Sequence, residues 1–317
     1  MSLPALTRRR VLRNAALGTA SILSAPYVRA RYSAGKLQIG AWDHSVPAAN
    51  EMFTRLCQAW AETNHVEVKI DFLTSTLMAS AEAQAREGHD IIAHPTWQVV
   101  LNRHMLEPVD DIITDLINNY GPMSPVATYL AKSDGAWRAV PATTGSVVKP
   151  CAWSTAVHEN PAVAEQCWTH DVPRGPRGRF VAEAPFFYGI WNFATNKAAA
   201  KSLLAFISAR EQAARLVAAA NGGDIPPFAS FYGFDTWQKV GPPPGTLYNY
   251  PPRGDTITTV PGWPARPDVA LQIFNQALQP TMVAKLTRND HTIDSVIAWA
   301  ARKLEDILCL RMSHNCA

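Results

Sequence analysis

The stretch "LQIGAWDHSVPAANEMF", residues 37–53, contains a predicted strand followed at once by a predicted helix. Apolar side chains alternate over residues 37–42, which is typical of a β-strand. Ser45 is a suitable N-cap and Pro47 suits the first helical turn, after which an apolar stripe recurs with helical spacing. The two elements meet at Trp42-Asp43-His44, an aromatic ring beside an acid and an imidazole.

The same alternation of elements continues to about residue 104. Residues 66–73 predict a second strand, 75–87 a helix, 90–94 a third strand and 97–104 another helix. This order predicts an α/β fold with a parallel sheet and helices on its faces. Ligands bind outside the carboxyl ends of strands in such sheets. The three predicted ends carry Trp42-Asp43-His44, Thr74-Ser75 and His94-Pro95-Thr96-Trp97.

The rest of the chain shows fewer regular patterns. In "DGAWRAVPATTGS" (134–146), Asp134-Gly135 predicts a hairpin turn that leads into an extended segment suited to a crossing between lobes. Residues 186–223 predict a strand, a turn and two helices, the first of them rich in alanine. Residues 226–267 are rich in proline and predict loops, and 293–308 predict a final helix.

Residues 1–30 are typical of an export signal. They contain five arginines and no acid, an apolar stretch from 15 to 25 and a small-residue cleavage site at Val28-Arg29-Ala30. The stretch "TRRRVLR" (7–13) resembles the twin-arginine signal. A basic arm that binds nucleic acid is the alternative, but the apolar stretch that follows directly favours export to the periplasm.

The net charge of +3 belongs to this segment. Without its five arginines the chain has 24 basic and 26 acidic residues, a net charge of −2, which argues against a nucleic-acid partner. The five cysteines (Cys57, Cys151, Cys167, Cys309 and Cys316) show no CxxC and no metal-ligand spacing. An oxidising compartment permits a disulfide among them, and we interpret Cys57 as a small buried hydrophobe on its predicted helix.

Motifs of catalysis and of cofactor binding do not occur in the sequence. It has no G-x-S-x-G, H-E-x-x-H, G-x-x-x-x-G-K-[ST] or G-x-G-x-x-G. The group Asp110, Asp111 and Asp115 is interpreted as a solvated face near a helix start. His89, His94 and His104 are not spaced as ligands on one helix face, so we expect neither a metal nor a cofactor.

Aromatic residues beside short polar residues at the strand ends indicate a different chemistry. Sugars offer apolar faces that stack on aromatic rings and hydroxyls that hydrogen-bond to acids, imidazoles and hydroxyls, and such sites are usually clefts between domains. Trp42, Trp97 and Trp153 are either ligand contacts of this kind or core residues. A helix cap is the alternative role of Asp43 and His44.

Four segments and the export signal together resemble the extracellular (periplasmic) solute-binding proteins of ABC transporters, family 1, which includes maltose-binding-like sugar receptors. The segments are "GAWDHSVPAANEMFTRLCQAWAE", "DIIAHPTWQVVLNRHMLEPVDDII", "DGAWRAVPATTGS" and "NKAAAKSLLAFISAREQAARLVAAANGGDIP", in that order. The resemblance implies two α/β lobes with parallel-rich sheets flanked by helices. It also implies a ligand held between the lobes, closure on that ligand and delivery to a membrane permease by a monomer.

The resemblance also implies which residues bind the ligand. The loop after the first strand supplies Trp42, Asp43 and His44, and the loop after the third supplies His94, Thr96 and Trp97. The segment "PCAWSTAV" is similar to a family segment whose aromatic residue faces the ligand, which assigns that role to Trp153. Tyr188 and Trp191 flank the strand that returns to the sheet and complete the set.

The chain departs from the family after "TGSVV", where Lys149-Pro150-Cys151 runs almost directly into Ala152-Trp153. A block that builds most of the second lobe in the family is absent, which predicts a shortened second lobe. The predicted domains are a signal peptide (1–30), the first lobe with the start of the crossing (31–148), the remnant of the second lobe (149–225), and a Pro-rich segment with C-terminal helices that pack across the lobes (226–317).

Two other functions remain open at this point. One is an exported hydrolase-like enzyme on a related scaffold, with His44 and Asp43 as an acid–base pair. The other is a truncated relative without function.

Overall fold

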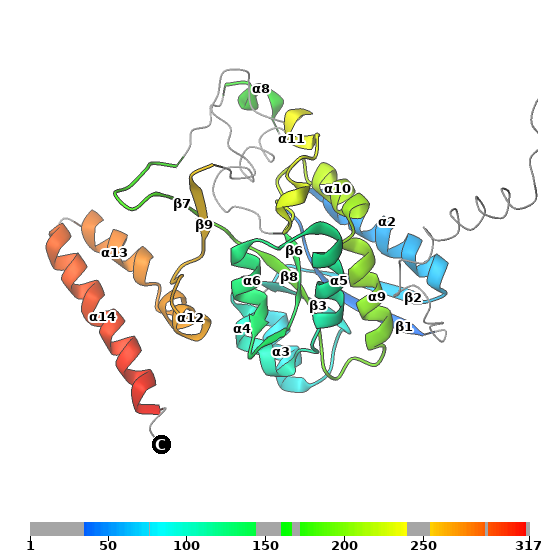
Figure 1. Ribbon diagram of the computed structural model, residues 1–317, viewed down its shortest axis with the longest axis horizontal. Helices are drawn as coiled ribbons and strands as arrows, with labels where there is room; N and C mark the ends of the chain where they lie inside the picture. The colour runs from blue at the N-terminus through cyan, green and yellow to red at the C-terminus, as the bar shows by residue number, and fades with distance from the viewer. Residues whose placement is uncertain are drawn as a thin grey trace, which may run out of the picture.

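A five-stranded sheet forms the centre of the molecule. The structure is a computed structural model that describes residues 35–75, 77–143, 160–166, 172–239, 254–288 and 291–314. The strands lie in the spatial order β2–β1–β3–β8–β6 (Figure 1). Their bounds are β1 Lys36–Trp42, β2 Glu67–Leu73, β3 Ile91–Pro95, β6 Val140–Thr143 and β8 Phe186–Ile190.

The first three strands confirm the predicted parallel arrangement. β1 pairs in parallel with β2, from Lys36 opposite Glu67 to Trp42 opposite Leu73, and in parallel with β3 on its other side. β8 then runs antiparallel to both β3 and β6. The sheet is therefore mixed, with its parallel half built from the first 95 residues.

Helices cover both faces of this sheet. α2 (Pro47–Asn64), α9 (Lys197–Ile207) and α10 (Arg210–Ala219) pack on one another along one side, with α5 (Asp110–Tyr120) against α9. α3 (Leu77–Ala85), α4 (Gln98–Asn102) and α6 (Pro125–Ala131) lie on the other side, next to β3 and β6. The short η2 helix, Arg103–Met105, extends α4. The observed layers agree with the predicted α/β class.

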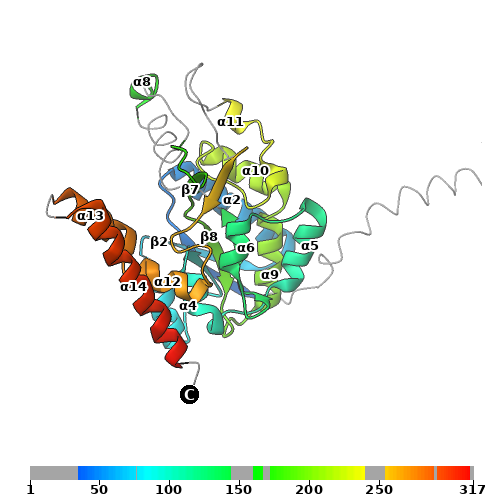
Figure 2. The same cartoon turned by 60° about the vertical axis from the view of Figure 1, so that its left-hand side comes forward.

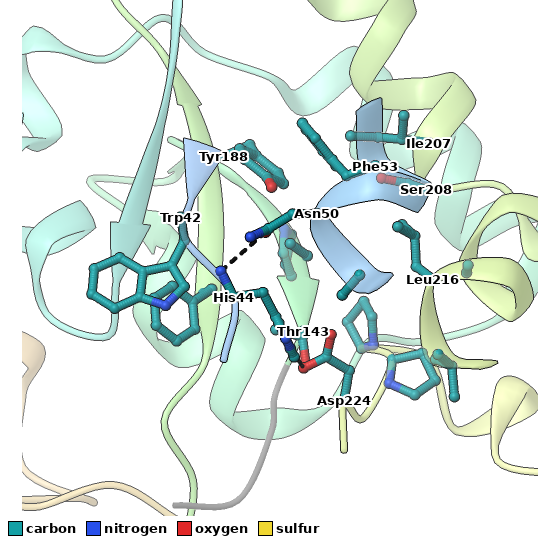
Figure 3. A pocket seen from close by; sticks show the side chains of 18 of the residues that line it. Trp42, His44, Asn50, Phe53, Thr143, Tyr188, Ile207, Ser208, Leu216 and Asp224 are labelled. Carbon is teal, nitrogen blue, oxygen red and sulfur yellow. Dashed lines mark hydrogen bonds and ion pairs between the residues drawn. The ribbon is translucent and has the colours of Figure 1, made fainter. Parts of the chain in front are cut away.

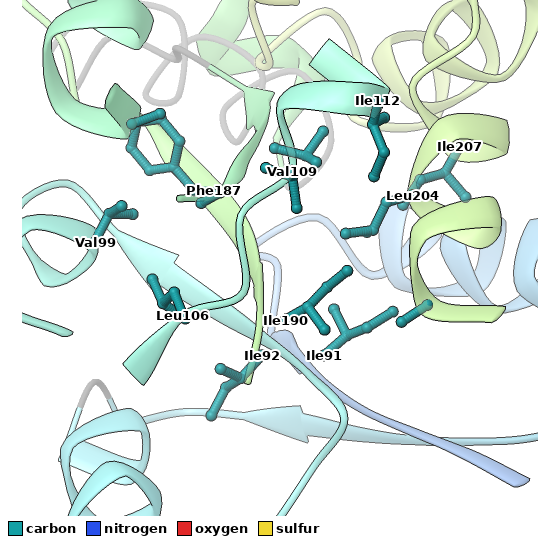
Figure 4. Close-up of a cluster of buried hydrophobic side chains, with 14 of the residues drawn as sticks. Ile91, Ile92, Val99, Leu106, Val109, Ile112, Phe187, Ile190, Leu204 and Ile207 are labelled. Atoms are coloured by element: carbon teal, nitrogen blue, oxygen red, sulfur yellow. The ribbon is translucent and has the colours of Figure 1, made fainter. Parts of the chain in front are cut away.

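The core covers both faces of the sheet, and one part of it lies between the sheet and the layer that contains α5 and α9. The apolar side chains that meet there have almost no exposed surface and include Ile91, Val109, Ile112, Ile190 and Leu204 (Figure 4). Cys57 of α2 belongs to the same core and is fully buried, as its helical position predicts, and burial raises the pKa of its thiol to about 12. Burial of this apolar surface is the main force that holds the two layers together.

The hairpin predicted at Asp134-Gly135 is confirmed. It joins the two-residue strands β4 (Lys132–Ser133) and β5 (Ala136–Trp137), which pair antiparallel. Asp134 and Gly135 have φ angles of 52° and 81°. Positive φ at both loop positions is the geometry that an Asp-Gly pair favours in a two-residue hairpin.

A second, smaller assembly lies beside the main sheet. β7 (Arg179–Ala182) and β9 (Thr256–Thr259) form a two-stranded parallel pair. α12 (Pro267–Asn275), α13 (Leu278–Thr287) and α14 (Ile293–His314) follow, and both views show α13 and α14 standing outside the α/β body (Figures 1 and 2). The short elements α8 (Pro161–Ala164), η3 (Ala229–Phe231) and α11 (Thr236–Lys239) complete the described chain.

Two segments differ from what the sequence predicts. The range 149–225 was predicted as a remnant of a second lobe, but its residues 186–219 supply β8, α9 and α10 to the main sheet and its covering layer. The cause is that β8 pairs with both β3 and β6, and its Phe187 and Ile190 are fully buried in the main core. The range 226–267, predicted as loops, contains η3, α11 and β9. β9 exists only through its partner β7, which is far away in sequence.

None of the helices in the described residues is long and apolar enough to cross a membrane.

Candidate functional site

A cavity of about 420 Å³ lies at the carboxyl end of β1 (Figure 3). This volume is within the range of small-molecule sites in proteins. Its walls come from the end of β1, the first turns of α2, strands β6 and β8, and the junction of α9 with α10. Its aromatic lining comprises Trp42, Phe53, Phe72, Phe186, Tyr188 and Phe231. Its polar lining comprises Asp43, His44, Ser45, Asn50, Thr143, Ser208 and Asp224.

The loop between β1 and α2 is held by side chains of the helix that follows it. The backbone N–H of Asp43 donates to the carbonyl of Leu73 at 3.1 Å, which extends the pairing of β1 with β2. Asn50 then accepts a hydrogen bond from the His44 N–H at 3.0 Å and donates to Asp43 Oδ1 at 2.7 Å. Asn50 therefore fixes two of the three predicted loop residues.

The start of α2 differs in detail from the prediction. Pro47 occupies the first turn as expected, but Val46 and not Ser45 is the N-cap residue, and no side chain caps the helix there. Ser45 instead lines the cavity. Asn50, in the first turn of α2, holds the preceding loop through its side chain.

His44 and Asp224 lie next to each other in the lining of the cavity. His44 Nδ1 accepts the N–H of Val46 at 2.8 Å, which leaves Nε2 to carry the proton of the neutral ring. Nε2 lies 3.5 Å from Asp224 Oδ1. Burial is the largest influence on the pKa of His44 and lowers it, but Asp224 and, to a smaller extent, Asp43 raise it, so the net pKa lies above its usual value.

Two aromatic pairs form the apolar walls. The rings of Trp42 and Phe186 are 5.0 Å apart between centroids and tilted by 40°, and those of Phe53 and Tyr188 are stacked at 5.5 Å. The Tyr188 hydroxyl is directed into the cavity in Figure 3, and burial raises the pKa of this group, so it stays a neutral donor. Flat apolar faces beside neutral and charged polar groups suit a ligand with an apolar ring face and polar substituents.

The structure brings together four of the predicted site residues, namely Trp42, Asp43, His44 and Tyr188. The lining of this cavity does not include four other predicted residues, His94, Thr96, Trp97 and Trp191. Trp153 lies outside the described residues.

The residues that do not line the cavity have structural surroundings of their own. His94 is fully buried edge-on to Trp191, and burial lowers the pKa of His94 to about 4, so the ring is neutral at pH 7. A Cβ at Gly189 would lie 2.7 Å from the His94 ring, so β8 can approach only without a side chain at that point. Trp191 donates from Nε1 to Glu82 at 2.9 Å. These residues pack the sheet against its helices.

Trp97 and Thr96 hold the turn after β3. Trp97 is only 3% exposed and packs edge-on to Tyr129, with ring centroids 5.9 Å apart. Thr96 has a φ of 38°, and its N–H donates to the carbonyl of Pro185 at 2.7 Å. The residue just before β8, Pro185, thus binds the Thr96 backbone at the edge where the sequence predicts a ligand contact.

Sequence reasoning missed Asn50, Thr143, Phe186 and Asp224 as lining residues. Asn50 and Phe186 lie within patterns that predict only a helix and a strand. Asp224 follows a Gly-Gly pair in "ANGGDIP", which is the end of one of the four segments that carry the family resemblance. This segment was the one available signal that Asp224 belongs near the site.

No protein-family model matches the chain, and no curated protein matches it either. Solved structures do match the chain. The GacH receptor of Streptomyces glaucescens, solved unliganded and with acarbose, is 12% identical, with a TM-score of 0.60 over 87% of this chain and 99% of its own. The maltose-bound MalE3 of T. maritima is 13% identical, with a TM-score of 0.60 over 86% of this chain and 100% of its own.

A third structure is an ABC transporter solute-binding protein from Thermotoga lettingae bound with α-D-tagatose. It is 12% identical, with a TM-score of 0.60 over 87% of this chain and 100% of its own. The chain has the periplasmic-binding-protein fold. This fold agrees with the family resemblance in the sequence.

The periplasmic-binding-protein fold accounts for the position of the cavity, because open α/β sheets present ligands at the carboxyl ends of their strands. The predicted shortening of the second lobe stays a prediction, since the junction at 149–153 lies outside the described residues.

Proposed function

We propose that the protein is the periplasmic substrate-binding component of an ABC importer and holds a sugar-like solute in the cavity at the end of β1. The observation that carries this proposal is the combination of aromatic walls with short polar side chains at a strand's carboxyl end. Trp42 supplies a ring face for stacking, and Asp43, His44 and Tyr188 supply hydrogen-bonding groups. Delivery to a membrane permease and export through the twin-arginine pathway are parts of the same proposal.

The geometry of His44 supports binding over catalysis. A general acid or base needs a ring nitrogen within reach of the ligand. Nδ1 already accepts the Val46 N–H, and Nε2 faces Asp224. Asp43, the proposed partner in an acid–base pair, is instead hydrogen-bonded to Asn50. These partners favour a site that holds polar groups in place over one that transfers protons to a ligand.

Thermal melts of the purified protein with a panel of mono- and oligosaccharides test this function. A sugar that binds raises the melting temperature, and at a hundred times its dissociation constant it adds about 2.7 kcal/mol to the free energy of unfolding. Chromatography of the same samples shows whether the sugar is unchanged. Conversion of the sugar would favour the enzyme, and a melt that no sugar shifts would contradict the receptor.

Replacing Trp42 by Ala should weaken binding of the stabilising sugar by at least about tenfold, the equivalent of about 1.4 kcal/mol, because a stacking face is lost. Titration calorimetry measures this change. Trp299→Ala is a matched control, since Trp299 is also partly exposed but lies on α14, outside the cavity lining. Equal affinities of Trp42→Ala and the unmodified protein would remove Trp42 from the site.

A further inference from the structure

The cavity carries an excess of negative charge. Among its described lining residues are two carboxylates, Asp43 and Asp224, and neither lysine nor arginine. His44 is the one lining residue in this described set that can take up a positive charge near neutral pH. The site therefore has a charge of about −2 with a neutral His44 and about −1 with a protonated one.

The two carboxylates are not equivalent. Asp224 faces His44 Nε2 at 3.5 Å, so a protonated His44 offsets its charge. Asp43 is bonded at Oδ1 to the neutral amide of Asn50 at 2.7 Å, which orients the carboxylate without neutralising it. Asp43 is also exposed at the mouth of the cavity and accessible to a ligand. Asp43 interacts more weakly with His44 than Asp224 does, so one oriented carboxylate stays available in either state of His44.

The aromatic walls add to this preference. Asp43 follows Trp42 directly, and the Trp42 ring lies beside Phe186 with centroids 5.0 Å apart. The faces of aromatic rings are negative and attract cations within about 6 Å. A cationic group in the cavity is therefore favoured by the carboxylates and by the ring faces that line it, whereas an anionic group is disfavoured by both.

We propose that the site prefers sugars that carry a protonated amino group over neutral and acidic sugars of the same size. This inference rests on the proposed function and names its substrate class. The amino group lies beside Asp43 at the mouth, and the sugar ring stacks on the aromatic walls. Hydroxyls of the sugar then reach the polar lining formed by Thr143, Ser208 and Asp224.

Two matched series of sugars test the preference by titration calorimetry at constant pH and ionic strength. The monosaccharides are glucose, glucosamine, N-acetylglucosamine and glucuronate. The disaccharides are cellobiose, chitobiose with free amines, and N,N′-diacetylchitobiose. We expect each amine to bind at least about tenfold more tightly than its neutral and acetylated counterparts, because a hydrogen bond to a charged group replaces a neutral one. Glucuronate should bind most weakly.

The variant Asp43→Asn should bring the ratio of the affinities for the amine and the neutral sugar down to about one, because the charge that distinguishes the two ligands is lost. An asparagine keeps an acceptor for Asn50, so the loop stays in place. Asp294→Asn is the control, because it removes the same charge from an exposed position on α14. This control should leave the preference unchanged.

The possible results separate the two proposals. Equal affinity for amino and neutral sugars, or a preference that survives in Asp43→Asn, overturns the inference and leaves the receptor function intact. If no sugar in either series binds to the unmodified protein, the proposed function and this inference both fail.

Discussion

Glu183 is a buried acid at the point where β7 leads into β8. Only 2% of its surface is exposed, and its N–H donates to the carbonyl of Thr259 at 2.9 Å, which continues the β7–β9 pairing. Burial raises the pKa of its carboxyl group to about 8, against a smaller opposing effect of Thr258. The side chain is therefore protonated in the folded protein at neutral pH, although an exposed glutamate would be ionised.

This burial predicts a pH-dependent stability. The folded pKa, about 8, lies above the ordinary value of 4.5, so the folded state holds its proton more strongly than the unfolded state does. The free energy of unfolding should fall as the pH rises from about 4.5 to about 8, by up to about 1.4 kcal/mol per pH unit. Glu183→Gln does not titrate and should gain stability relative to the unmodified protein over this range.

Urea unfolding at pH 5, 6.5 and 8 measures this difference. Glu51→Gln, at an exposed position of α2, is the control and should track the unmodified protein at all three values. A constant difference between Glu183→Gln and the unmodified protein would contradict the prediction, because it would show that Glu183 ionises in the folded state as readily as in the unfolded state.

At the scale of an element, α2 positions the candidate site and ends in a strained residue. Its first turns hold the Asp43–His44 loop through Asn50, and its buried face contributes Phe53, Cys57 and Trp60 to the main core. The helix stops at His65, whose φ of 55° and ψ of 42° are left-handed. Glycine adopts this conformation at a helix end without the steric cost that a Cβ brings.

Replacing His65 by Gly should therefore stabilise the protein by about 0.5–1 kcal/mol. His65 is exposed, so the change removes no buried contact. Gln58→Gly, at an exposed position in the interior of the same helix, should destabilise by about 1 kcal/mol, because glycine lowers helix propensity there. Urea unfolding of both variants should show opposite changes in the free energy of unfolding at two positions of one helix. A loss of stability in His65→Gly would contradict the inference that the backbone is strained at His65.

At the scale of the whole molecule, the C-terminal helices have a small core of their own. Val269, Ile273, Leu278 and Ile307 form a cluster separate from the main core. The Tyr129 hydroxyl of α6 donates to the carbonyl of Ala265 at 2.6 Å, and the ring of Trp97 lies 6.3 Å from that of Phe274. These contacts connect the helices α12–α14 to the α/β body.

Tyr129→Phe should therefore loosen α12–α14 more than the main sheet. The lost hydrogen bond is worth about 0.5–1.5 kcal/mol, so amide exchange in 267–314 should accelerate by up to about tenfold. Hydrogen-exchange mass spectrometry measures this change, with 36–42 and 91–95 as the unchanged reference. Tyr120→Phe, at the end of α5, is the control, and equal exchange in both variants would show that Tyr129 does not attach the helices.

Much of the first half of the fold is predictable because its signals are local. Period-two alternation and helical stripes locate β1, β2, β3 and α2, and their order implies the parallel pairing that the structure has. Asp134-Gly135 defines its hairpin through the positive φ that this pair tolerates. The position of Trp42, Asp43 and His44 at a strand's carboxyl end follows from the same patterns.

Only the tertiary structure decides what those strand ends meet. β8 enters antiparallel beside β3 and delivers Phe186 and Tyr188 to the cavity, while the segment after α10 places Asp224 next to His44. It also buries His94, Trp97 and Trp191, whose residue types alone cannot distinguish a ligand contact from a core position. The physical reason is that secondary structure follows from neighbours in sequence, whereas burial and the walls of a cavity depend on segments that are more than a hundred residues apart.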